Sequence, residues 1–328
     1  MKNNSLKEIA DYIRNNDNYL IIGHIDPDGD ALGSTMAFKF LLDSLGKNSL
    51  ILFHSDLREE YEILFKYLIP EDYFIYQDAE KMSQLKKYKR AIVLDSANIE
   101  RLGNFQELIQ ACYKINIDHH YDNSKFGNLN YINSDQSAVG KIIYDLTKIM
   151  SVDISEHLGT AIALAVLADT GFLKYPNSDP ASFRLIANLK EKGIDIVEIN
   201  RFLQSFSSIN YLKLLAKGLA NIKLDKSGKI AWLVLSYSEL KEVEIDDQEV
   251  KNLVNYPRDI RGVEVGISFV EKGKNFIDIS FRSLNYVDVS EIAHKFKGGG
   301  HPRASGTKVE GKLNDVVNEV ITEVKKNV

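Results

Sequence analysis

Short apolar runs alternate with helical patterns in the first half of the chain. Each run is short enough to form one buried strand. The runs cover residues 19–22, 49–53, 91–94 and 114–117. Between them, residues 30–46 and 59–68 carry apolar side chains at helical spacing. Because strands that alternate with helices form parallel sheets, this pattern predicts a doubly wound, mostly parallel α/β sheet with helices on both faces.

The second half of the chain changes character twice. Residues 137–223 look almost wholly helical, and the segment 199–222 within them has no obvious sheet partner. Strand-like runs and helical patterns then follow at residues 230–235, 263–270, 276–281, 289–296 and 313–325. The strand-like runs at 263–270 and 276–281 alternate apolar and polar residues, which is typical of a sheet with one covered face. A smaller α+β domain is therefore expected at the end of the chain.

Length supports a division into two domains. At roughly 100–200 residues per domain, a chain of 328 residues predicts two domains. We expect a first domain over residues 1–198, a helical connector over 199–222 and a second domain over 223–328. A cleft is expected between the two domains.

Charge and cysteine content limit the partners and the compartment. The net charge is −5, whereas a protein that coats duplex DNA is normally basic, so duplex DNA is not an expected partner. Cys112 is the only cysteine, which excludes an internal disulfide and favours a reducing compartment. The chain begins without the apolar stretch of a signal peptide, and no run approaches the ~18–20 apolar residues of a membrane span. These features predict a cytoplasmic location without a membrane segment.

Histidine and aspartate side chains follow three of the predicted strands. They are His24, Asp26, Asp28 and Asp30 after the first strand, Asp95 after the third, and Asp118, His119 and His120 after the fourth. Because the carboxyl ends of parallel strands meet at one edge of a sheet, ligands of such sheets bind there. The sequence therefore predicts a metal site at this edge.

Simpler explanations exist for these residues when each is taken alone. Asp30 directly precedes a predicted helix and fits a helix cap, and a lone histidine is more often a surface or core residue than a ligand. The spacing of Asp26, Asp28 and Asp30 imitates a calcium loop. Such a loop needs Gly and Glu where this chain has Ala31 and Ala37, which excludes it. The convergence of three separate segments favours a metal site.

The donor set indicates which metals and which chemistry fit. Several carboxylates in one place repel one another and raise their own pKa values unless cations neutralise them. Imidazole and carboxylate ligands without thiolate suit Mn²⁺, Fe²⁺, Zn²⁺ or Co²⁺. Two such ions about 3.5–4 Å apart would activate a water and clamp a phosphoryl group.

Five motifs in order make the chain resemble a known family. They are HIDPDGDALGS at 24–34, DSANIERLG at 95–103, DHH at 118–120, DTG at 169–171 and GGGHPRASG at 298–306. This order is similar to that of the DHH phosphoesterase family with its DHH-associated C-terminal domain. The length is most similar to the stand-alone bacterial nano-RNases of that family.

The resemblance implies a set of ligands for two divalent ions. It places one ion on His24, Asp28 and Asp95, and the other on Asp30, Asp95, His119 and Asp169. Asp95 would bridge the two ions. Asp169 alone fits the end of an apolar helix, and only the resemblance implies that it is a ligand. Manganese is the ion implied, with Mg²⁺ or Co²⁺ as substitutes.

Other residues near the implied ions take catalytic roles by the same resemblance. His120 would face the scissile phosphate as an acid or orienting group, Asp118 would support the histidines, and Arg101 would face the phosphate. Asp26 replaces the Asn that is common in the family, and we interpret it as a residue outside the ligand set.

The glycine-rich segment near the end of the chain is a predicted substrate site. The residues expected to contact substrate are Arg282, Gly298, Gly299, Gly300, His301 and Arg303. Glycines let main-chain N–H groups approach an anion, and neighbouring cations would hold the phosphate of a short nucleotide. Lys297 and Ser305 stand where the family usually has Gly and Ala. Arg258 and Arg261 fit either this pocket or a solvated loop.

These features together imply a function and leave alternatives open. The resemblance implies hydrolysis of di- and short single-stranded oligoribonucleotides to nucleoside 5′-monophosphates. It also implies removal of the 3′-phosphate of 3′-phosphoadenosine 5′-phosphate (pAp), because both reactions attack a phosphorus on a ribose 3′-oxygen. The alternatives are a phosphodiesterase for cyclic dinucleotides or their linear products pApA and pGpG, and a non-catalytic nucleotide-binding module. The oligomeric state is open, with a homodimer as one alternative. A family-II pyrophosphatase lacks the GGGH motif, and a RecJ-type exonuclease has further domains.

Overall fold

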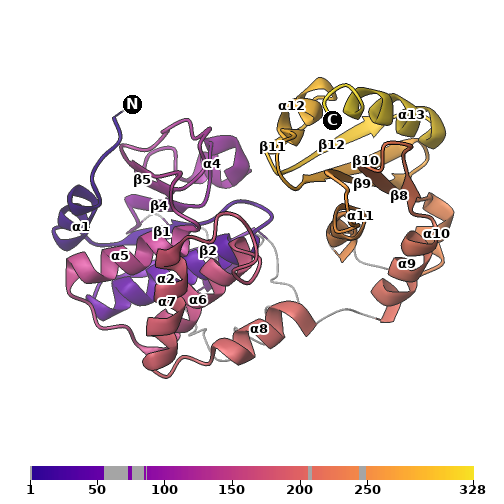
Figure 1. Cartoon of the computed structure of the whole chain (residues 1–328). Helices are drawn as coiled ribbons and strands as arrows, with labels where there is room; N and C mark the ends of the chain where they lie inside the picture. The colour runs from indigo at the N-terminus through magenta and orange to yellow at the C-terminus, as the bar shows by residue number, and fades with distance from the viewer. Residues whose placement is uncertain (1, 55–72, 76–84, 86, 206–208, 244–248) are drawn as a thin grey trace. The chain divides into compact units, whose positions relative to one another are not determined.

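The chain divides into two compact units, residues 1–206 and 207–328 (Figure 1). The computed structural model describes residues 2–54, 73–75, 85, 87–205, 209–243 and 249–328. The helix predicted over 59–68 lies outside the described residues. Within those that are described, no helix is both long and apolar enough to cross a bilayer.

The first unit is built on a parallel sheet. In the described part of the chain its strand order is β3-β2-β1-β4-β5-β6, and every neighbouring pair is parallel. The strands are β1 (Tyr19–Ile22), β2 (Ser49–Phe53), β3 (Tyr73–Ile75), β4 (Arg90–Leu94), β5 (Tyr113–Asp118) and β6 (Leu129–Ile132). The doubly wound α/β fold predicted from the sequence is confirmed. The strands β3 and β6, at the two edges, were not predicted.

Helices bury both faces of this sheet. They are α1 (Leu6–Arg14), α2 (Gly29–Ser44), α4 (Phe105–Leu108), α5 (Val139–Met150), α6 (Glu156–Asp169), α7 (Pro180–Glu191) and α8 (Ile196–Ser205), with a 3-10 turn η2 (Ile99–Leu102). Tyr19 and Ile21 of β1 join the core formed with α1, α2, α5 and α6. Leu20 and Ile22 join a second core with Leu102 and other residues. Burial on both faces explains why these strands are continuous apolar runs.

Helices α2 and α5 pack so closely against α6 that their backbones nearly touch it. A Cβ atom added at Gly33 of α2 would lie 2.6 Å from the main-chain N of Ala165, and one at Gly29 would lie 2.3 Å from Cβ of Ala168. A Cβ added at Gly140 of α5 would lie 2.4 Å from Cβ of Ala165. No side chain fits at these three positions without a shift of α6. Glycine therefore sets the spacing of the helix that ends at Asp169.

The second unit has a mixed sheet. Its order, among the described residues, is β11-β12-β10-β9-β8-β7, with β8 and β9 parallel and the other pairs antiparallel. The strands are β7 (Lys223–Leu224), β8 (Ile230–Leu235), β9 (Val265–Gly273), β10 (Phe276–Ser283), β11 (Gly299–His301) and β12 (Ala304–Glu310). The helices are α9 (Ile209–Ala220), α10 (Tyr237–Lys241), α11 (Asn255–Arg258), α12 (Val289–Lys295) and α13 (Leu313–Val324), with a 3-10 turn η3 (Glu249–Val254). The predicted α+β architecture is confirmed.

Two apolar clusters hold the second unit together. Alternate residues of β9 and β10 pack with α12 and α13 on one face of the sheet. Tyr211 and Leu214 of α9 pack with Leu233 and Leu235 of β8 in the other cluster. Helix α9 thus contributes to this core, whereas α8 lies in the first unit. The domain boundaries expected from the sequence, and the cleft between the domains, stay predictions.

Candidate metal centre

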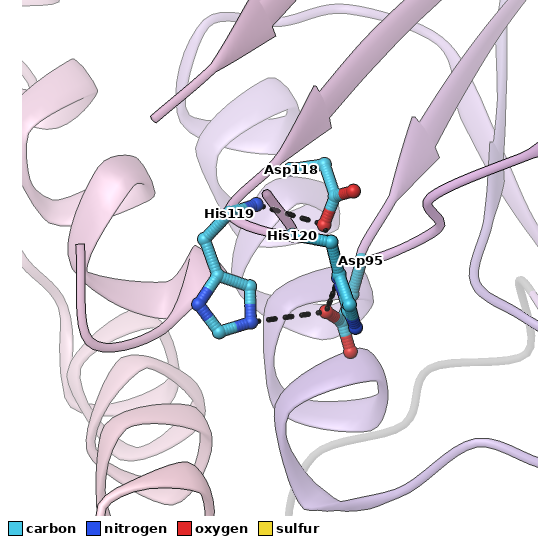
Figure 2. A group of neighbouring side chains, drawn as sticks. All are labelled: Asp95, Asp118, His119 and His120. Carbon is cyan, nitrogen blue, oxygen red and sulfur yellow. Dashed lines mark hydrogen bonds and ion pairs between the residues drawn. The ribbon is translucent and has the colours of Figure 1, made fainter. Parts of the chain in front are cut away.

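The ends of three central strands bring histidine and aspartate side chains together. His24 follows β1, Asp95 directly follows β4, and Asp118 is the last residue of β5 with His119 and His120 after it. Figure 2 shows the side chains of Asp95, His119 and His120 turned toward one another at this edge. Asp95 has φ of 54°, in the left-handed region that aspartate tolerates better than most residues. This backbone turn lies at the centre of the cluster.

The first group of donors consists of His24, Asp28 and Asp95. Nε2 of His24 lies 3.9 Å from Oδ2 of Asp28 and 3.8 Å from Oδ2 of Asp95. Oδ1 of Asp28 accepts hydrogen bonds from the main-chain N–H groups of Asp30 and Ala31, at 3.0 and 3.1 Å. Asp28 is therefore the N-cap of α2, and the cap fixes the carboxylate so that its other oxygen faces His24.

The second group consists of Asp30, His119 and Asp169. Nε2 of His119 lies 3.9 Å from Oδ2 of Asp30 and 3.7 Å from Oδ2 of Asp169. The same nitrogen lies 3.5 Å from Oδ1 of Asp95, which therefore adjoins both groups. The donor atoms within each group lie within 4.8 Å of one another, as the ligands of one ion do.

Two atoms at the centre are buried without a hydrogen-bond partner. They are Oδ1 of Asp95 and Nε2 of His24, and the described residues offer neither of them a partner. A buried polar atom without a partner costs about 1–3 kcal/mol, so these two atoms destabilise the cluster unless a ligand satisfies them. A divalent ion would satisfy both atoms. The donors present therefore fit a metal, while their assignment as ligands stays a prediction.

The electrostatics of the cluster also favour the binding of positive charge. Burial raises the pKa of Asp30 well above its ordinary value, and the nearby charges of Asp95 and Asp169 raise it further. Burial likewise raises the pKa of Asp169 to about 7, against the attraction of His119. Burial alone would lower the pKa of His119, but the contact of its Nε2 with Asp95 at 3.5 Å and the surrounding carboxylates raise it well above its ordinary value. Carboxylates crowded in this way favour a cation among them.

Asp118 is hydrogen-bonded to one of the neighbouring histidines. Its Oδ1 accepts a hydrogen bond from Nδ1 of His120 at 2.7 Å, and Nη1 of Arg101 donates to Nε2 of the same ring at 3.3 Å. Burial opposes the negative charge of Asp118, but hydrogen bonds from His120 and Asn123 outweigh it and lower the pKa of Asp118 to about 2. His120, Asp118 and Arg101 thus lie together, as expected from the sequence. Asp26, by contrast, is exposed and belongs to neither group.

The segment at the start of α5 holds two of the donors. The carbonyl oxygen of Gln136 accepts from Nδ1 of His119 at 3.1 Å, which leaves Nε2 to face the carboxylates. The main-chain N–H groups of Val139 and Gly140 donate to the two oxygens of Asp30 at 2.7 and 3.1 Å. Sequence reasoning missed this segment because it acts through main-chain atoms.

Asn177 was missed as well, although it contacts a predicted ligand. Its Nδ2 lies 3.1 Å from the carbonyl oxygen of Asp169 and 3.2 Å from that of Ser137. It therefore links the end of α6 to the start of α5. A polar residue in an irregular segment carries no pattern that would have marked it.

In the second unit, strand register brings two predicted substrate residues to one face. Arg282 of β10 pairs with Ala304 of β12, and Ala304 pairs with His301 of β11. Directly paired residues share a face of a sheet, so Arg282 and His301 lie two strands apart on the same face, about 10 Å from each other. Gly299 and Gly300 lie in β11, the edge strand next to them, and Gly298 directly precedes it.

Close contacts explain why this segment needs glycine. A Cβ at Gly298 would lie 2.2 Å from the carbonyl oxygen of Gly306, and one at Gly300 would lie 2.6 Å from that of Ala304. Lys297 has φ of 61°, a conformation that glycine adopts without strain. This left-handed backbone explains why the family usually has glycine at position 297.

Arg303 contacts the protein itself. Its Nη1 donates to the carbonyl oxygen of Val287 at 2.6 Å and lies 3.4 Å from Oγ of Ser283. On the other side of the same loop, the buried Glu264 accepts from the main-chain N–H groups of Asn285, Tyr286 and Val287 at 2.9, 2.7 and 3.1 Å. Arg303 thus helps to hold the loop between β10 and α12. The substrate contacts assigned to this unit stay predictions.

The fold and the site define a family. The family model described as "DHH family, N-terminal domain" matches residues 18–170, and the DHHA1 domain matches residues 228–327. Together the two domains account for most of the chain in the order that the five motifs indicated. The chain has a DHH-family N-terminal domain followed by a DHHA1 domain.

Relatives in this family are similar along nearly the whole chain. The probable bifunctional oligoribonuclease and PAP phosphatase NrnA of Streptococcus mutans is 28% identical over 302 residues, which cover 92% of this chain and 93% of that protein. The bifunctional oligoribonuclease and PAP phosphatase NrnA of Thermus thermophilus is 27% identical over 303 residues, which cover 92% of this chain and 87% of that protein. An exopolyphosphatase-related protein from Bacteroides fragilis superposes with a TM-score of 0.90 at 25% identity, covering 98% of this chain and 95% of that one.

Proposed function

We propose that this protein is a metal-dependent phosphoesterase that hydrolyses short oligoribonucleotides and removes the 3′-phosphate of pAp. The observation that carries the proposal is the pair of donor groups that adjoin at Asp95, with two buried atoms that lack partners. Relatives named as bifunctional oligoribonuclease and PAP phosphatase, similar over nearly the whole chain, support the choice of substrates.

The residues that would hold the metal follow from the two groups. His24, Asp28 and Asp95 would hold one divalent ion. Asp30, His119 and Asp169 would hold the other, with Asp95 shared between them. Manganese is proposed as the ion from the resemblance to the family, with Mg²⁺ or Co²⁺ as substitutes, and carboxylate and imidazole donors are compatible with it. When bound, the ions supply an activated water and neutralise charge on the phosphoryl group.

His120 and Arg101 would act on the phosphate. The hydrogen bond to Asp118 keeps a proton on Nδ1 of His120, so that Nε2 can exchange a proton with the ribose oxygen that leaves. Arg101 donates to that Nε2 in the absence of substrate. A bound phosphate would draw the guanidinium to itself and release Nε2, because a guanidinium binds an anion more strongly than a neutral ring.

The DHHA1 domain would bind the other end of the substrate. Arg282 and His301 lie on one face beside the glycines of β11, where their side chains and neighbouring main-chain N–H groups would hold a phosphate. A short single-stranded oligonucleotide or a small nucleotide is the proposed partner. A cytoplasmic location fits this substrate and the single cysteine.

A substrate panel tests the proposal. Purified protein with Mn²⁺ is incubated in parallel with a diribonucleotide, pAp, pApA, pGpG, a cyclic dinucleotide and pyrophosphate, and products are separated by chromatography. The expected result is nucleoside 5′-monophosphate from the diribonucleotide and AMP from pAp. Asp95→Asn, which tolerates the same left-handed backbone, should abolish both activities. Turnover of pyrophosphate or the cyclic dinucleotide alone would overturn the proposed substrates, and full activity of Asp95→Asn would overturn the proposed site.

A further inference from the structure

Asp118 is fully buried, and each of its carboxylate oxygens is already bonded within the protein. Oδ1 accepts from the main-chain N–H of His119 at 2.8 Å and from Nδ1 of His120 at 2.7 Å. Oδ2 accepts from Nδ2 of Asn123 at 2.6 Å. Asp118 also lies in a group with Asp95, His119 and His120 whose donor atoms are within 4.8 Å of one another. Because both of its oxygens are bonded within the protein, the carboxylate is better placed to orient His120 than to bind a metal. Its own orientation depends on the group that holds Oδ2.

That group is the side-chain amide of Asn123. Its Nδ2 also lies 3.0 Å from the carbonyl oxygen of Ser96 and 2.9 Å from Oδ1 of Asn116, a fully buried residue of β5. Its Oδ1 accepts from the main-chain N–H of Lys125 at 2.6 Å. Of the contacts made by Nδ2, the one with Asp118 is the shortest and the only one with a charged acceptor, which makes it the strongest.

The loop around Asn123 has other anchors. The main-chain N–H of Ser124 donates to the carbonyl oxygen of Ala97 at 2.8 Å, and Oγ of Ser124 donates to the same oxygen at 3.2 Å. These bonds do not use the Asn123 amide. Removal of the amide should therefore leave the loop in place and free the Asp118 carboxylate to rotate.

We propose that Asn123 is a positioning residue for the phosphate-facing histidine, an inference that rests on the proposed function. By holding Oδ2 of Asp118, the Asn123 amide keeps Oδ1 aligned with Nδ1–H of His120. Nε2 of the ring then points to Arg101 and to the place of the scissile phosphate. His119 is held separately by the carbonyl oxygen of Gln136, so the loss of Asn123 should affect turnover more than metal binding.

Two variants separate the effect of the Asn123 N–H donor from the effect of the side-chain shape. Asn123→Asp keeps the shape but removes the N–H donor and places a second carboxylate against Asp118. Asn123→Ala removes both. We expect kcat on a diribonucleotide to fall about 10–100-fold in both variants, as for other residues that orient catalytic groups, with KM changed less than about threefold. Asn128→Ala is the matched control, because Asn128 accepts from the main-chain N–H of Lys114 at the far end of β5 and should leave kcat unchanged.

Two readouts do not depend on turnover. Isothermal titration should show Mn²⁺ affinity within about threefold of the wild type in both variants. Nitrogen-15 spectra of the metal-free protein should show His120 protonated on Nδ1 in the wild type, and a mixture of ring states in the variants. An unchanged kcat in Asn123→Asp, or a loss of Mn²⁺ affinity equal to the loss of kcat, overturns the positioning role. A wild type inactive on every substrate would instead overturn the proposed function.

Discussion

The two units each bury acidic side chains, and they treat them in opposite ways. In the first unit, Asp30, Asp95 and Asp169 crowd around His119, and Oδ1 of Asp95 has no hydrogen-bond partner among the described residues. In the second unit, Glu264 receives main-chain hydrogen bonds from three successive residues and one from the side chain of Asn285. The first arrangement raises acid pKa values, and the second lowers the pKa of Glu264.

This difference separates a binding site from a structural anchor. Burial works to raise the pKa of Glu264, but the N–H groups of Val287, Tyr286 and Asn285 outweigh it. A carboxylate satisfied by main-chain donors stabilises the fold without any ligand. A group of acids that raise one another's pKa values instead destabilises the fold until a cation arrives. Four experiments can break or sharpen this distinction.

The largest effect is expected at Asp169. Asp169→Asn removes one charge from the crowded group, so activity with Mn²⁺ should fall at least about 100-fold. The same change should leave the metal-free protein as stable at pH 8 as the wild type, or more stable by about 1 kcal/mol, because it removes repulsion. Enzyme assays and thermal unfolding in EDTA measure the two quantities. A metal-free variant that is clearly less stable would make Asp169 a structural residue.

The next effect is expected at Glu264. Glu264→Ala leaves main-chain N–H groups of the loop between β10 and α12 without partners, which should destabilise the second unit by about 2–4 kcal/mol. Trp232 is the only tryptophan and lies in β8, so its fluorescence reports the unfolding of this unit. Urea titration followed by this signal gives the change, with Glu264→Gln expected to lie between the wild type and Glu264→Ala. A variant with the wild-type midpoint would contradict the anchoring role.

The two units should also respond to pH with opposite signs. Asp169 has an ordinary pKa of 3.8 and a folded pKa of about 7, so the metal-free first unit should lose about 1–3 kcal/mol as pH rises between these values. Glu264 has a lowered pKa, so its contribution is present above its ordinary pKa of 4.5 and is lost as pH falls through the folded value.

Hydrogen exchange of α6 amides and Trp232 fluorescence report the two units separately. The measurements run from pH 4 to pH 8 in EDTA and again with Mn²⁺, which should remove the loss in the first unit. A first unit whose metal-free stability rises across this range would show that its acids are satisfied without a cation.

The smallest effect is expected at Asp288, the N-cap of α12. Its Oδ1 accepts from the main-chain N–H of Ser290 at 2.9 Å, in the same loop that Glu264 holds. Asp288→Ala should destabilise the second unit by about 1 kcal/mol, and Asp288→Asn by less, because asparagine also caps helices. The Trp232 signal measures both. A loss as large as that of Glu264→Ala would mean that one cap, rather than the buried glutamate, fixes the loop.

The sequence predicted the central strands well because their burial leaves a plain signal. The strands β1, β2, β4 and β5 are covered on both faces and read as apolar runs. The short edge strand β6 has only one buried residue in four, and β12 contains Gly306 and several polar residues, so neither carries that signal. Pairing with neighbouring strands, which a single sequence does not display, decides their structure.

Some residues of the candidate site could likewise be predicted from the sequence, and others could not. The side chains after β1, β4 and β5 could be placed at one edge because the positions of strand ends follow from the fold class. Asp169 was implied only by resemblance, since the close packing of α6 brings it to the cluster. Gln136, Val139 and Gly140 act through carbonyl and N–H groups that every residue possesses. Asn123 is marked only by its bonds in three dimensions.

The glycines that let α6 pack directly against α2 and α5 also set the distance between Asp169 and the donors on α2. Ala168, the neighbour of Asp169, lies where a methyl group on Gly29 would have to stand. A Gly33→Ala change, one helical turn after Asp30 in α2, would push α6 and Asp169 away from the donors on α2 by a fraction of an ångström. The distance between Asp169 and the aspartates at the start of α2 thus depends on positions that carry no side chain.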